Sequence, residues 1–85
     1  MKYAIEFTRS AQRALEGIPE RDLKKVARRV DALADNPRPP GTKKLRGGTD
    51  EYRLRVGDYR VIYSVTDSGL LVTVIRIAHR RDAYR

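Results

Sequence analysis

The segment 52–63 constrains the fold more than any other part of the chain. Its polar and apolar residues alternate on both sides of Gly57–Asp58, a pair typical of a tight hairpin turn. If the turn has only these two residues, Arg55 lies directly opposite Arg60. Because strand side chains alternate between faces, Arg53 lies on the same side. The segment therefore predicts a β-hairpin that carries three arginines on one face.

This arrangement works against the stability of the sheet. Like charges that face each other across two strands cost roughly 0.2–1 kcal/mol per pair. Solvation alone explains any single exposed arginine, but a fold gains from a facing pair only when an anion normally binds there. Guanidinium groups bind phosphate oxygens through strong, often bidentate, hydrogen bonds. The hairpin therefore predicts a site for a polyanionic ligand.

The charge of the whole chain agrees with such a ligand. Nineteen lysines and arginines against eleven aspartates and glutamates give a net charge of +8 and an isoelectric point near 10.3. An excess of this size in a small domain indicates a nucleic acid or an acidic protein as partner. The alternative is a basic surface that is simply well solvated.

Composition also limits the class of protein. Eighty-five residues predict one domain, residues 1–85, with one modest core. No apolar stretch approaches the ~18 residues of a membrane span, and the N-terminal run 1–7 lacks the apolar core of a signal peptide. There is no cysteine and only one histidine, so we expect neither a disulfide framework nor a metal site or other cofactor. A cytoplasmic protein is expected.

The N-terminal half predicts one strand followed by two helices. Lys2–Phe7 alternates like a strand, and Thr8 is a suitable N-cap for a short helix that ends at Gly17. Pro19 suits the first turn of a second helix, and Asn36–Pro37 stops it. The apolar stripe of that second helix comprises Leu23, Val26, Ala27, Val30, Leu33 and Ala34.

The C-terminal half predicts strands. Lys43–Arg46 reads as a brief edge strand before the hairpin, and Asp67–Gly69 as a second turn. The run Leu70–Ala78 is almost wholly apolar and β-branched, which predicts a central strand buried on both faces. The whole pattern predicts an α+β fold, with two N-terminal helices packed on a small, mainly antiparallel sheet.

The register of the last strand is left open by the sequence. A two-residue loop at Ser68–Gly69 would place His79 on the arginine face, whereas a three-residue loop would place Arg76 and Arg80 there. The choice decides which C-terminal side chains reach the anion site.

Two further basic segments are candidates for the same site. Lys43, Lys44 and Arg46 precede two glycines and could contact phosphate, although the pattern is far from a P-loop. The run 79–85 follows the last strand and includes Arg81; its alternative reading is a frayed, solvated tail. Within it, His79 is the best candidate acid or base, because the unperturbed pKa of histidine, about 6.5, lies near neutrality. Tyr84 offers a ring that can stack on a base.

Four segments, in this order and spacing, resemble the RelE branch of the RelE/ParE toxin superfamily across essentially the whole chain. They are Lys44-Leu-Arg-Gly47, Tyr52-Arg-Leu-Arg55, Tyr59-Arg-Val-Ile-Tyr63 and Ala78-His-Arg-Arg-Asp-Ala-Tyr84. The resemblance implies the toxin of a type II toxin–antitoxin pair, a metal-independent endoribonuclease that enters the ribosome and cuts messenger RNA in the A site. It also implies a cognate antitoxin that binds the toxin in a hetero-oligomer.

The resemblance assigns roles to individual residues. Arg53 and Arg55 fall where the family has basic residues on the first hairpin strand, although some members have lysine there. Arg60 matches the phosphate-stabilising arginine and Arg80 the C-terminal catalytic arginine. Tyr84 matches a tyrosine that stacks on the substrate base, at a tighter spacing from Arg80 than in some relatives.

Two other functions compete with this interpretation. The ParE branch shares the scaffold but acts on DNA gyrase, and it generally lacks the C-terminal arginine and tyrosine that are present here as Arg80 and Tyr84. A non-catalytic homologue that binds only RNA or an antitoxin is the second alternative. All of these proteins would bind in a salt-dependent manner, so affinity alone does not separate them.

Overall fold

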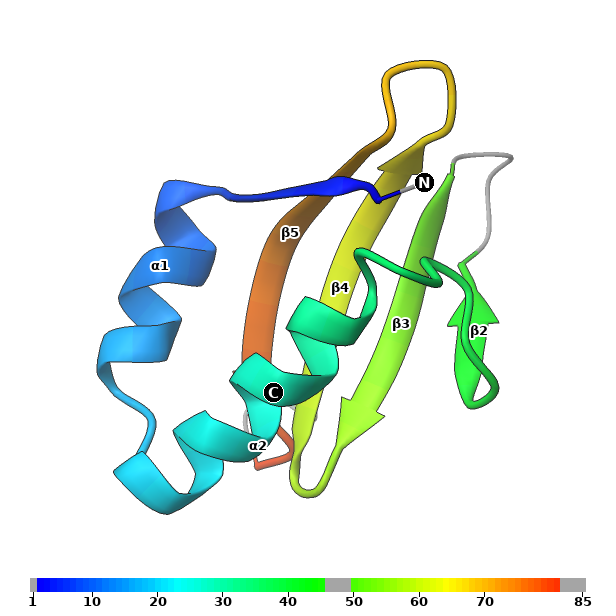
Figure 1. The fold of residues 1–85 in the computed structure, drawn as a ribbon. Coiled ribbons are helices and arrows are strands. Elements are labelled where there is room, and N and C mark those ends of the chain that lie inside the picture. The colour runs from blue at the N-terminus through cyan, green and yellow to red at the C-terminus, as the bar shows by residue number, and fades with distance from the viewer. Residues whose placement is uncertain (1, 46–49, 82–85) are drawn as a thin grey trace.

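The computed structural model describes residues 2–45 and 50–81, and within them two helices pack on one five-stranded sheet (Figure 1). The strand order is β1-β5-β4-β3-β2; β1 runs parallel to β5 and the other neighbours are antiparallel. This confirms the predicted α+β class. In chain order the elements are β1 (Ala4–Phe7), α1 (Arg9–Glu16), α2 (Glu20–Ala32), β2 (Thr42–Lys44), β3 (Glu51–Val56), β4 (Tyr59–Thr66) and β5 (Leu71–His79).

The helices begin where the sequence predicts. The Thr8 backbone is extended, and its hydroxyl accepts a hydrogen bond from the Ala11 amide at 3.2 Å. The same hydroxyl donates to the Ile75 carbonyl at 2.6 Å, which ties the start of α1 to β5. Pro19 precedes α2, which ends at Ala32, short of the predicted stop at Asn36–Pro37, because residues 33–35 turn more tightly. No helix of residues 2–45 and 50–81 has the length and apolar character needed to cross a membrane.

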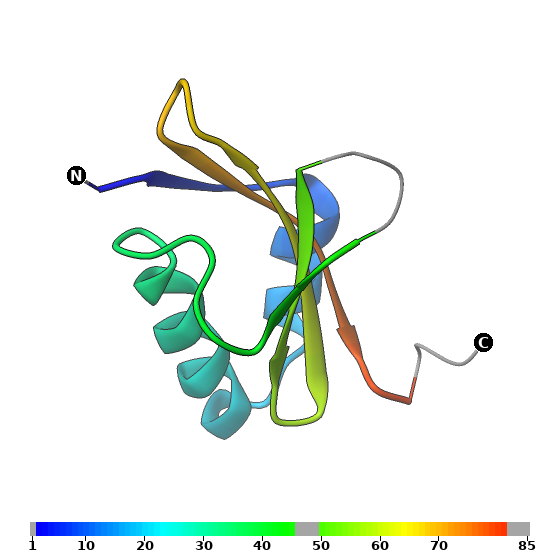
Figure 2. The ribbon, with the colours of Figure 1, turned by 90° about the vertical axis from the view of Figure 1, so that its right-hand side faces the viewer.

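Both helices cover the same face of the sheet, so the core lies on that side only (Figure 2). Along β3 and β4 every second side chain is buried, which is the alternation expected of a sheet with one solvated face. Leu54, Val61 and Tyr63 are fully buried, as are Val26, Val30 and Leu33 from the helix side. We call the other face, which carries the hairpin arginines, the open face.

The last strand differs from its prediction. β5 is not buried on both faces: Val72, Val74 and Ile77 are buried, whereas Arg76 is exposed. The reason is that the helices cover one face only, so β-branched residues on the open face are only half-covered. The buried positions shift phase after Val74 because the β4–β5 ladder has a bulge at Ile62/Tyr63.

The hairpin register agrees with the prediction. Gly57 and Asp58 form a two-residue turn with Gly57 at a φ of 59°, and Arg55 pairs directly with Arg60. The Arg55–Arg60 facing pair is therefore a feature of the fold.

Neither loop length considered for the second turn is correct. Thr66 pairs with Leu71, so the loop comprises residues 67–70. Ile62 pairs with Arg76, which places Arg76 on the open face with the hairpin arginines, and Tyr59 pairs with His79, which places His79 on the helix-covered face.

A polar cluster fastens the end of the sheet near this second turn. Arg38 forms a bidentate pair with Asp67, with N···O distances of 3.1 and 2.8 Å, and its Nε donates to the Tyr52 hydroxyl at 2.8 Å. The Tyr3 hydroxyl donates to Asp67 at 2.7 Å. These four residues, the Arg38 clamp, join the residue before β1, the α2–β2 loop, β3 and the β4–β5 turn.

Buried Tyr63 adds a further tie beside the Arg38 clamp. Its hydroxyl donates to the Pro37 carbonyl at 2.7 Å, and burial raises the pKa of the phenol to about 12. Its ring stacks on that of Tyr52 with centroids 5.7 Å apart. The loop that leads into β2, and with it the edge of the sheet, is therefore held from two sides.

Candidate functional site

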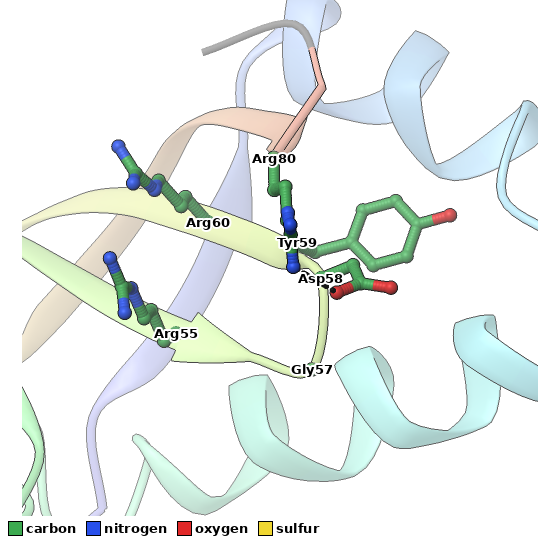
Figure 3. A pocket seen from close by; sticks show the side chains of 6 residues that line it. All are labelled: Arg55, Gly57, Asp58, Tyr59, Arg60 and Arg80. Carbon is green, nitrogen blue, oxygen red and sulfur yellow. Dashed lines mark ion pairs between the residues drawn. The ribbon is translucent and has the colours of Figure 1, made fainter. Parts of the chain in front are cut away.

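A hollow of about 200 Å³ lies at the hairpin turn (Figure 3). The β3–β4 turn is at the opposite end of the sheet from the β4–β5 turn, which carries Asp67 of the Arg38 clamp (Figure 1). Its charged lining comprises three arginines and one aspartate. The six lining residues are Arg55, Gly57, Asp58, Tyr59, Arg60 and Arg80. We call it the arginine hollow.

The two-residue turn creates the hollow. Because Arg55 and Arg60 are direct cross-strand partners, their side chains extend side by side from neighbouring strands, while Tyr59 points the other way (Figure 3). Arg55 is exposed and Arg60 half-buried. The guanidinium groups thus present hydrogen-bond donors to one region of solvent, as binding of an oxyanion requires.

Arg80 completes the hollow from the end of β5. Its backbone N–H donates to the Asp58 carbonyl at 2.6 Å, which fixes its backbone against the hairpin turn. Its guanidinium Nη1 lies 3.7 Å from Oδ1 of Asp58, and the two side chains are 71% and 62% exposed. So long and exposed an ion pair contributes little stability, and a stronger anion can take the place of the aspartate.

A second set of cations lies one step further along the strands. Lys43 pairs with Arg53, Arg53 pairs with Ile62, and Ile62 pairs with Arg76, so the four residues form one cross-strand row on the open face. Of these, Lys43 and Arg76 are exposed and Arg53 is half-buried. The predicted site set did not include Arg76, because its face depends on the register of β5.

The structure separates the other predicted lysine from this row. Lys44 pairs with Tyr52, whose side chain belongs to the core, so Lys44 lies toward the helix side of the edge strand. Arg81 is exposed and lines a second hollow with Asp58, His79 and Arg80, directly beside the arginine hollow. Arg46 and Tyr84 lie outside the described residues.

His79 does not share the arginine face. Its ring meets that of Tyr59 edge-on with centroids 5.1 Å apart, on the helix-covered side of the sheet. Its Nδ1 accepts a hydrogen bond from the Arg81 amide at 3.1 Å. Burial raises the pKa of the Tyr59 phenol. His79 therefore packs the end of β5 beneath the arginine hollow and lies on the opposite face from Arg55 and Arg60.

The chemistry available in the hollow is that of positive charge. Arginine stays protonated at any physiological pH, so it stabilises anions and accepts protons poorly. Among residues 2–45 and 50–81, no three histidine, aspartate or glutamate side chains come together as a metal site. The arrangement suits the binding of a phosphate group and the stabilisation of extra negative charge on it.

Comparison with protein families gives a match along nearly the whole chain. A family model described as the ParE toxin of the type II toxin–antitoxin system parDE matches residues 5–84. Toxin RelG of Mycobacterium tuberculosis is 34% identical over 88 aligned positions, which cover 100% of this chain and 99% of the relative. Putative toxin RelE1 of Methanocaldococcus jannaschii is 31% identical, with coverage of 100% and 98%.

Solved structures include the same fold. The crystal structure of the archaeal RelE–RelB complex from Pyrococcus horikoshii OT3 contains a chain that superposes with a TM-score of 0.84 at 30% identity. The superposition covers 94% of this chain and 97% of that one.

Proposed function

Because the chain belongs to the RelE/ParE superfamily of type II toxin–antitoxin toxins, we propose that it is a ribosome-dependent endoribonuclease that cuts messenger RNA in the ribosomal A site. The observation that carries the proposal is the arginine hollow. There Arg55 faces Arg60 across the hairpin and Arg80 reaches over its turn. The relatives named RelE and RelG support the RelE branch.

RNA supplies its own nucleophile, so the protein need not carry one. In the proposed reaction the ribose 2′-oxygen attacks the adjacent phosphorus and the bond from phosphorus to the 5′-oxygen breaks. The proton of the 2′-hydroxyl leaves with a base and the departing 5′-oxygen takes up a proton. The products are a 2′,3′-cyclic phosphate and a 5′-hydroxyl end.

The arginines act on the charge that this reaction develops. Negative charge increases on the non-bridging phosphate oxygens as the 2′-oxygen attacks. Preorganised donors aimed at such charge are usually the largest catalytic contribution of a site. We assign this role to Arg60 and Arg80, with Arg55 as a further electrostatic contributor and Arg53 supporting from the neighbouring row. Holding the linkage in line for attack adds to the rate.

Asp58 has a definite place in this scheme. Its carboxylate lies 3.7 Å from the Arg80 guanidinium. A phosphate that enters the hollow competes with Asp58 for the same donors. Because the pair is exposed, this exchange costs little free energy.

Neither the arginines nor His79 is well suited to transfer the protons of this reaction. Arginine is a poor general base. His79 has suitable chemistry but packs against Tyr59 on the other face, so we assign it a positioning role at the end of β5. A pH–rate profile of cleavage tests this role. Between about pH 5.5 and 7.5 we expect the profiles of the parent and of His79→Gln to have the same shape.

We also propose a cognate antitoxin protein as partner, in a toxin–antitoxin hetero-oligomer. Similar structures were solved as RelE–RelB complexes, from Pyrococcus horikoshii and, as RelBE2, from Mycobacterium tuberculosis. The net charge of +8 suits an acidic binding segment.

The decisive experiment maps the 5′ ends of messenger RNA in a translating extract, with and without the protein. The proposal predicts new 5′ ends within codons, present only on ribosome-bound messages and absent with Arg60→Ala. Intact RNA together with loss of gyrase supercoiling would overturn it in favour of a ParE-like action.

A further inference from the structure

The cross-strand row of Lys43, Arg53 and Arg76 is a second feature of the open face that the fold alone does not explain. Lys43 lies directly opposite Arg53, so this is a second facing pair of like charges, next to the Arg55–Arg60 pair. Arg76 is exposed on β5, beyond the end of β1, whose last residue Phe7 pairs with Val74. Within residues 2–45 and 50–81, none of the three side chains forms a salt bridge.

We propose that this row is a second phosphate subsite, which holds the phosphate next to the scissile one on a single-stranded RNA. The inference rests on the proposed function for the identity of the first phosphate. It assigns a role in positioning the RNA to Arg76, the residue that brings the row across to β5. The substrate it implies is a strand bound through two successive phosphates.

The spacing of the two rows supports this assignment. Arg53 and Arg55 are two residues apart on β3, which separates the rows by ~6.6 Å along the strand. That separation is comparable to the length of one nucleotide in an extended single strand. A backbone that places one phosphate in the arginine hollow therefore brings its neighbour over the Lys43–Arg76 row.

The surface between the cations suits a nucleotide more than an acidic peptide. Ile62 lies in the second row between Arg53 and Arg76, and Ala78 lies in the first row opposite Arg60; both are half-buried. They give an apolar floor on which a ribose or base can rest while the guanidinium groups at its margins hold the phosphates. Arginine's planar fork binds carboxylate and phosphate oxygens alike, so the apolar floor and the spacing of the rows are what favour a nucleotide.

The next row ends the basic surface. There Glu51 pairs with Ser64, Ser64 with Thr73, and Thr73 with Glu6, so carboxylates flank the row at both margins. Glu6 is exposed and Glu51 half-buried. A third phosphate would meet these carboxylates, which limits the favourable contacts to two successive phosphates.

The test measures binding of non-cleavable 2′-O-methyl oligoribonucleotides at several salt concentrations. A dinucleotide offers one phosphate and a trinucleotide two. For single strands each phosphate contact contributes about 0.7 to the slope of log affinity against log salt. The variant is Arg76→Thr, because threonine keeps strand propensity, and the matched control is Arg21→Ala, an exposed arginine of α2 on the far side of the sheet.

We expect Arg76→Thr to weaken trinucleotide binding about threefold to tenfold, to reduce its salt slope by about 0.7, and to leave dinucleotide binding unchanged. Lys43→Thr should act in the same direction, and Arg21→Ala should change neither ligand. Equal salt slopes for Arg76→Thr and Arg21→Ala would overturn the subsite. So would a loss confined to antitoxin binding, which would identify the row as a protein interface.

The two proposals fail separately in this design. If the protein cuts messenger RNA but Arg76→Thr keeps the full trinucleotide slope, the subsite is wrong and the proposed function stands. If the slope falls with Arg76→Thr but no message is cut, the subsite stands as an RNA-binding feature and the nuclease proposal is wrong.

Discussion

The two turns that flank β4 each place an arginine beside an aspartate, and the two pairs differ in distance and in hydrogen bonding. At the β4–β5 turn, Arg38 and Asp67 form a bidentate contact with a shortest distance of 2.8 Å, and Tyr3 and Tyr52 complete the hydrogen bonding. At the β3–β4 turn, Arg80 and Asp58 approach only to 3.7 Å with both side chains mostly exposed. The same two residue types thus form a structural clamp at one end of the sheet and a loose contact at the other.

The difference lies in what surrounds each pair. At the Arg38 clamp one carboxylate balances one guanidinium, and the hydrogen bonds from Arg38 and Tyr3 lower the pKa of Asp67. At the arginine hollow, three arginines surround one aspartate, and two of the arginines face each other across the hairpin. The clamp matches one guanidinium with one carboxylate, whereas the hollow brings three guanidinium groups and one carboxylate around one space.

The largest expected effect comes from removing a cation at the hollow. Arg60→Ala should lower the rate of message cleavage by about 10²–10³-fold, the usual cost of losing one donor aimed at developing charge. Single-turnover cleavage on programmed ribosomes measures it. Arg21→Ala, which also removes one arginine, is the matched control and should cleave normally. Full activity of Arg60→Ala would show that the site is misplaced.

The second effect comes from the clamp and should appear in stability. Arg38→Ala removes the bidentate pair and the bond to the Tyr52 hydroxyl, and should lower the free energy of unfolding by about 1–2 kcal/mol, since the pair is partly exposed. Urea unfolding measures the change. At a temperature where the variant is folded, its single-turnover cleavage rate should equal that of the parent. A lower cleavage rate of Arg38→Ala with an unchanged free energy of unfolding would contradict the structural role of the Arg38 clamp.

The third effect is an acid dependence confined to the clamp. Because the folded-state pKa of Asp67 is lowered, its contribution to stability is present above the unfolded-state pKa of about 3.9 and is lost as pH falls through the folded-state value. Asp67→Asn should therefore be less stable than the parent at neutral pH, and the two should converge in acid. Asp58→Asn is the matched change at the other turn and should lower stability at neutral pH much less than Asp67→Asn does, because its ion pair is long and exposed. Parallel curves for the parent and Asp67→Asn would contradict this.

The smallest effect tests whether the facing arginines work against the fold. Arg55→Thr removes one member of the pair and introduces a residue that favours strands, so it should raise the free energy of unfolding by up to about 1 kcal/mol. The same variant should bind RNA more weakly. Reduced stability would mean that the facing pair contributes to the fold and is no sign of a ligand.

Local sequence patterns predicted the features that depend on local chemistry. The hairpin register follows from the Gly57–Asp58 turn, and the start of α1 follows from the Thr8 cap. The arginine pair at the hollow could be predicted because two residues fix the turn.

The β4–β5 register could not be predicted in this way. The loop has four residues and passes through Leu70 at a φ of 50°, a conformation that leucine rarely adopts. The β4–β5 ladder also has a bulge at Ile62/Tyr63. These two irregularities decide that Arg76 faces the hairpin arginines and that His79 does not. The Arg38 clamp was missed because its pairing with Asp67 joins residues 29 positions apart.

The central claim is that the arginine hollow acts on an RNA linkage that carries its own nucleophile. It is tested by following cleavage of a ribosome-bound message in which the nucleotide before the cut has a 2′-deoxyribose. We predict that the ordinary message gives a 2′,3′-cyclic phosphate and a 5′-hydroxyl end, and that the deoxy message stays intact at that position although it is bound. Cleavage of the deoxy message at the same position would contradict the account.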